Sequence, residues 1–77
     1  MSQKYNITVE YNRSEHSVTA KNAEEAVILF EQEFPNYFKN DLTFLIVQKA
    51  EGRIKTRFAV NSNSGKASKI EVLGIIP

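Results

Sequence analysis

Only one stretch of this chain, residues 23–34, has the spacing of an amphipathic helix, and the other patterned stretches have the spacing of strands. At about 100° per residue, one side of that helix collects apolar side chains, namely Ala23, Ala26, Val27, Phe30 and Phe34. Asn22 is a favoured N-cap residue, and Glu25 can reach back to the Asn22 N–H as in a capping box. Pro35 ends the helix or begins a further short turn. The rest of the fold must therefore be built from strands.

Two strands are expected before the helix. Apolar and polar residues alternate over residues 5–11 and again over residues 16–20, which is the pattern of strands with one buried face. The polar link between them, residues 12–15, is short and rich in turn-forming side chains. The two strands should therefore pair as an antiparallel hairpin.

Three further strands are expected after the helix. Residues 42–49 are almost continuously apolar, which is typical of a central strand covered on both faces. A short turn over residues 50–52 leads into residues 53–61, which alternate more clearly than any other stretch. Residues 62–68 predict a flexible polar loop, and residues 69–76 predict a last strand in which Gly74 marks a bulge or bend.

These elements predict an α+β fold. Its core is a mainly antiparallel five-stranded sheet, in the sequence order β-β-α-β-β-β, with one helix packed on one face. The connection through the helix should be right-handed if the two strands that it joins are parallel neighbours. No repeat or low-complexity linker divides the 77 residues, so residues 1–77 are expected to form a single small α+β domain.

Cysteine is absent from the chain, which excludes a disulfide framework, cysteine-ligated zinc and a thiol nucleophile. Small secreted domains usually carry disulfides, so a reducing compartment, the cytoplasm, is expected. The N-terminus has no apolar stretch long enough for a signal peptide. No run approaches the roughly 20 apolar residues that span a bilayer, so no membrane partner is expected.

The sequence has no pattern typical of a catalytic, cofactor-binding or metal-binding site. His16 is the only histidine, and one histidine without cysteine does not build the usual structural zinc site, so a surface or edge position in the hairpin is expected. Residues 64–66 combine serine, glycine and lysine but lack the spacing of a P-loop. Acid–base hydrolysis needs a cleft that holds the substrate, whereas the helix carboxylates fall on the solvated side: Glu24, Glu25, Glu31 and Glu33. We therefore expect no enzyme, no cofactor and no metal.

Charge is distributed unevenly along the chain. Residues 1–48 carry four basic and seven acidic side chains, a net charge of −3, whereas residues 49–77 carry six basic and two acidic ones, a net charge of +4. Such asymmetry can indicate an interaction surface. Alternation in the fourth strand directs three basic side chains to the sheet face opposite the helix, and two more follow. The expected partner- or phosphate-binding residues are Arg53, Lys55, Arg57, Lys66 and Lys69.

The apolar neighbours of these basic residues depend on the turn after residue 49. A two-residue loop would place Leu45 opposite Phe58 and direct Phe44 and Ile46 to the open face. A three-residue loop would direct Leu45 and Val47 to that face instead. Either register leaves an apolar pair among basic side chains. A second copy, another protein, a nucleic acid or the stems of the basic side chains themselves would have to cover it.

Ile28 does not fit the apolar stripe of the helix and lies among its carboxylates. Two interpretations are open. The side chain is either an edge of the helix covered by a loop or by residues 35–40, or an exposed apolar contact for a partner.

Two function classes compete. Small, cysteine-free chains with many lysine and asparagine residues and no motif are typical of accessory proteins of phages and mobile elements. The sequence thus favours a non-catalytic module that binds another protein, with inhibition or modulation of a larger complex as its expected role. The alternative is a nucleic-acid-binding domain that uses the basic sheet face, although the aromatic residues of an RNA-recognition sheet are missing. A homodimer is compatible with either class.

Overall fold

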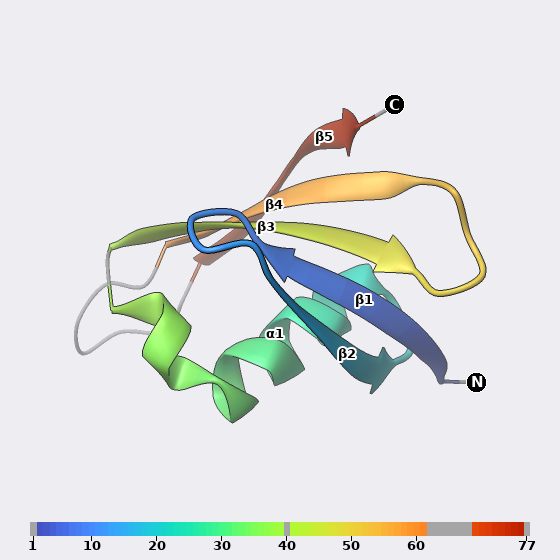
Figure 1. Ribbon diagram of the computed structural model, residues 1–77, viewed down its shortest axis with the longest axis horizontal. Coiled ribbons are helices and arrows are strands. Elements are labelled where there is room, and N and C mark those ends of the chain that lie inside the picture. The colour runs from blue at the N-terminus through green and yellow to red at the C-terminus, as the bar shows by residue number, and fades with distance from the viewer. Residues whose placement is uncertain (1, 40, 62–68, 77) are drawn as a thin grey trace.

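The computed structural model describes residues 2–39, 41–61 and 69–76. These residues form a five-stranded antiparallel sheet with one α-helix packed against it, as the sequence predicts (Figure 1). The elements are β1 (Gln3–Val9), β2 (Ser14–Ala20), α1 (Ala23–Glu33), the 3₁₀ turn η1 (Pro35–Phe38), β3 (Leu42–Lys49), β4 (Lys55–Asn61) and β5 (Lys69–Ile76). The expected polar loop over residues 62–68, and Lys66 with it, lies outside the described residues.

The strand order is β2-β1-β3-β4-β5, so β1 lies between the two strands that the helix connects. The first hairpin pairs Tyr5 with Val18, and β1 pairs with β3 through Ile7 and Val47. β2 and β3 are therefore not neighbours, and the chain crosses over β1 on its way through α1. This arrangement leaves β2 at one edge of the sheet and β5 at the other.

The start of α1 follows the expected capping chemistry with one difference. The Asn22 side chain accepts a hydrogen bond from the Glu25 N–H at 2.8 Å. The Glu25 carboxylate reaches back one residue further than expected and accepts the Lys21 N–H at 3.3 Å, rather than that of Asn22. At the other end, Pro35 has no N–H to continue the helix, and the chain turns directly into η1.

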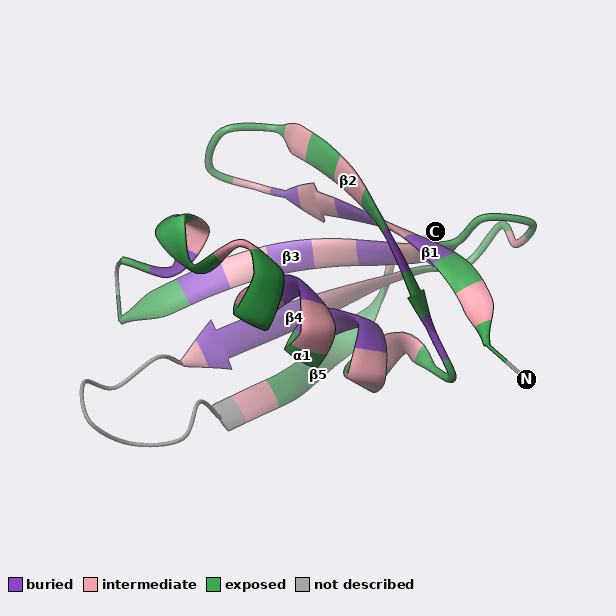
Figure 2. Cartoon of the chain, turned by 90° about the horizontal axis from the view of Figure 1, so that it is seen from below, coloured by how far each residue is buried: buried purple, intermediate pink, exposed green. Residues whose placement is uncertain are grey.

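The core lies between α1 and the sheet, where the helix buries Ala26, Val27 and Phe30. Ala23 and Phe34, at the ends of the predicted stripe, are partly buried against this core. Alternate residues of the strands meet the helix, and the largest side chains among them are fully buried: Ile7, Val9, Leu45, Val47, Phe58 and Val60. Figure 2 shows this alternation along β1 and β3, where buried positions alternate with intermediate ones.

An aromatic cluster joins the helix to β2 and η1. The Phe30 ring lies 5.1 Å from that of Phe34 and is stacked on Tyr37 at 5.8 Å between ring centroids. His16 lies 4.5 Å from the Phe34 ring, and its Nε2 is hydrogen-bonded to the Tyr37 hydroxyl at 2.9 Å. His16 thus lies on the edge strand of the hairpin, which is one of the two expected positions, and its ring is partly buried in this cluster.

Phe30 should be the side chain on which the helix–sheet contact depends most. We expect Phe30→Ala to lower the free energy of unfolding by about 3–5 kcal/mol, because the substitution leaves a cavity at the centre of the core. Ile28→Ala, on the exposed side of the same helix, should change it by about 1 kcal/mol or less. Urea denaturation followed by circular dichroism measures both variants. Equal losses in the two variants would contradict this description of the core.

Candidate functional site

The β3–β4 pairing selects one of the two registers that the sequence leaves open. Leu45 lies opposite Phe58, so Phe44 and Ile46 face away from the helix. The connection is longer than expected, because β3 ends at Lys49 and β4 begins only at Lys55. The predicted start of this strand at residue 53 is therefore wrong.

Arg57 covers the apolar pair on the open face. Its Nε donates to one carboxylate oxygen of Glu10 at 2.6 Å, and its terminal nitrogen donates to the other at 3.1 Å. On the way it crosses the Phe44 ring, with the guanidinium carbon 4.5 Å from the ring centroid, and Ile46 is its direct partner on β3. The hydrogen bond to Glu10 raises the pKa of Arg57. The cover that a partner would have supplied thus comes from the protein itself.

The predicted basic residues do not gather into one patch. Arg53 lies in the connection before β4 rather than on the strand, and Arg57 is paired with Glu10. Lys55 is exposed and lies opposite Gln48 on one side and Ile76 on the other. The backbone of Lys69 pairs with Asn61 at the opposite end of β4, six residues away and about 20 Å along the strand. A continuous basic stripe is absent from the described part of the sheet.

Exposed apolar side chains gather instead on and beside β5. Their exposed fractions are 53% for Val72, 45% for Leu73, 68% for Ile75 and 63% for Ile54. α1 packs over β1, β2 and β3, and β5 lies on the far side of β4 from them (Figure 1). Most of β5 is coloured as exposed in Figure 2. The helix therefore leaves the last strand without full cover.

A groove runs between the start of α1 and this uncovered strand. It is lined by residues of three segments: Asn22, Ala23 and Glu24 at the start of the helix, Thr56 and Phe58 of β4, and Val72 of β5. Val72 lies opposite Phe58 on β4, and Ile75 lies opposite Thr56, so both β5 residues share the helix-side face. An apolar group that enters the groove would meet Val72 directly.

Ile28 belongs to the same side of the helix. It lies about 40° from Glu24 around the helix axis. Its exposed fraction is 43%, and the neighbouring Leu29 packs against the core instead. Of the two interpretations left open by the sequence, the exposed apolar side chain agrees with the structure.

A β-bulge interrupts β5, as the glycine in its sequence suggests. Arg57 lies opposite Gly74 and Phe58 lies opposite Val72, so Leu73 is the extra residue. Gly74 has a φ of 147°, a conformation that L side chains rarely adopt. Bulges twist a sheet edge and limit how far a neighbouring strand can follow it.

Hydrogen bonds at the two ends of β1 show which backbone groups join which strands. The Glu10 N–H donates to Phe44 at 3.1 Å, and the Ala50 N–H donates to Lys4 at 2.9 Å. Bonded and non-bonded pairs alternate in an antiparallel ladder, so even-numbered residues of β3 bond to β1 and odd-numbered residues bond to β4. Odd-numbered residues of β3 lie opposite even-numbered residues of β4. The backbone groups of even-numbered β4 residues therefore bond to β3, and those of odd-numbered β4 residues bond to β5.

The alternation determines which backbone N–H and C=O groups of β5 point away from β4. Ala59 lies opposite Glu71, and Arg57 lies opposite Gly74, so the backbone groups of these two β5 residues point to β4. The N–H and C=O groups of Ile70, Val72 and Ile75 consequently point away from the sheet. Among the described residues, β5 has no neighbouring strand on that side.

The two edges of the sheet differ in character. At the β2 edge, the same alternation directs outward the backbone groups of Glu15, Ser17 and Thr19, whose side chains are charged or polar. Charged and polar edges discourage pairing with another chain, whereas an apolar edge invites it. The outward backbone groups of β5, by contrast, belong to the apolar residues Ile70, Val72 and Ile75.

Ile54, Leu73 and Ile75 are not among the site residues predicted from the sequence. A signal was present, because residues 72–76 contain no charged or polar side chain to face solvent at an edge. The strand order was needed to show that this segment lies at an edge rather than in the middle of the sheet.

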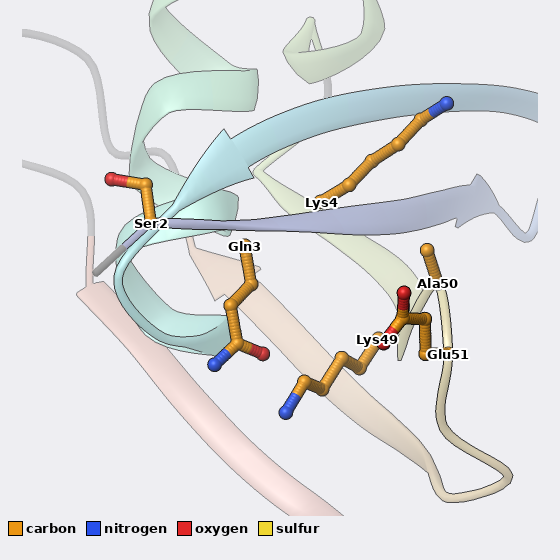
Figure 3. A pocket seen from close by; sticks show the side chains of 6 residues that line it. All are labelled: Ser2, Gln3, Lys4, Lys49, Ala50 and Glu51. Atoms are coloured by element: carbon orange, nitrogen blue, oxygen red, sulfur yellow. The ribbon is translucent and has the colours of Figure 1, made fainter.

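A second depression lies at the β1–β3 end of the sheet and is lined by Ser2, Gln3, Lys4, Lys49, Ala50 and Glu51 (Figure 3). The ammonium groups of Lys4 and Lys49 point in different directions and do not converge on one position. The described residues contain no group of side chains that could hold a metal ion and no helix long and apolar enough to cross a membrane.

Comparison of the chain with protein-family models, curated proteins and solved structures finds no match.

Arg57 should stabilise the folded protein, because it covers apolar side chains on the open face of the sheet. We expect Arg57→Ala to lower the urea midpoint, because Phe44 and Ile46 lose their cover and Glu10 loses its ion-pair partner. Lys55→Ala, two residues away on the same face, should leave the midpoint nearly unchanged. Unfolding curves of the two variants provide the comparison, and a larger effect at Lys55 would refute this assignment.

The orientation of the β5 backbone predicts an alternating pattern of amide exchange. In the isolated protein, the amides of Ile70, Val72 and Ile75 should exchange with solvent faster than those of Glu71 and Gly74, because only the latter are bonded to β4. Hydrogen exchange followed by NMR measures each amide separately. Uniform protection along β5 would mean that its outer edge is already paired.

Proposed function

We propose that this chain is a non-catalytic protein-binding module. Its partner docks on the β5 flank, which is the outer edge of β5 with the exposed side chains of Val72, Leu73 and Ile75. The observation that carries the proposal is the combination of an outward-facing strand edge with the exposed apolar side chains of Val72, Leu73 and Ile75. Exposed apolar groups on a small domain are favourable only when something covers them, and an apolar strand edge is suited to another polypeptide.

The electrostatics favour a protein over a nucleic acid as the partner. Nucleic-acid affinity depends largely on cations that neutralise phosphates. Arg57 already has a carboxylate partner, and Lys55 and Lys69 lie at opposite ends of the β4–β5 pair. The β5 flank itself presents aliphatic side chains rather than aromatic platforms for stacking bases.

A small sheet that binds through one flank acts on its partner by covering a surface. Inhibition or modulation of a larger complex is the expected consequence, as for an accessory protein of a phage or mobile element. The absence of cysteine from a domain this small supports the cytoplasm as the compartment where binding takes place.

Affinity capture with matched variants tests this proposal. Tagged wild-type protein, Val72→Asp and Thr19→Asp are used to capture proteins from the native cytoplasm, with and without nuclease, and the bound proteins are quantified by mass spectrometry. The two substitutions place the same charge on opposite edges of the sheet. We expect one partner to survive nuclease, to fall by about tenfold or more with Val72→Asp and to be retained by Thr19→Asp.

Two outcomes would contradict the proposal. A partner retained fully by Val72→Asp would show that binding does not use β5. Recovery of nucleic acid, or of proteins that disappear with nuclease, would support the alternative function, in which the basic residues bind the phosphates of a nucleic acid. Lys55→Glu would then be the variant that loses binding, with a steep dependence on salt.

A further inference from the structure

We draw no further inference here: the strongest candidate, the groove between the start of α1 and β5 with the exposed side chains of Val72 and Ile75 on the same face, is an apolar surface, and nothing in the described part of the chain shows what covers it.

Discussion

A single helix has to cover one face of a five-stranded sheet, and this constraint organises the described part of the molecule. Neighbouring strands lie about 4.8 Å apart and a helix with its side chains is about 10 Å across, so one helix does not span five strands. α1 packs over β1, β2 and β3, and Phe58 and Val60 of β4 are buried in the same core as Phe30. The sheet is wider than the helix, so β5 at its edge stays exposed.

The opposite face of the sheet is covered in a different way. Arg57 lies across Phe44 to reach Glu10, so one side chain shields apolar surface and neutralises a carboxylate at the same time. A basic residue that resembles a binding group in the sequence thus has an internal role in the structure. Exposed apolar side chains lie instead at the β5 edge, namely Val72, Leu73 and Ile75.

Local features of the fold were predictable because they depend on residues close together in the chain. The first hairpin, the Asn22 cap and the bulge at Gly74 all follow from short-range patterns and backbone preferences. The β3–β4 register was restricted to two alternatives, since both faces of β3 are apolar and period-two patterning cannot choose between them. The five-residue connection between β3 and β4 and the partial burial of His16 among Phe30, Phe34 and Tyr37 were not predictable. Both depend on contacts between residues that are distant in the sequence.

The sequence by itself determined the number and kind of elements, their α+β class and the apolar face of each, because hydrophobic periodicity and capping act over a few neighbouring residues. Only the tertiary structure decided that β1 lies between β2 and β3, that Arg57 pairs with Glu10 47 positions away, and that β5 lies at an edge beyond the helix. Strand order depends on how distant segments pack on one core. The identity of the strand left exposed is therefore a property of the assembled sheet rather than of any one segment.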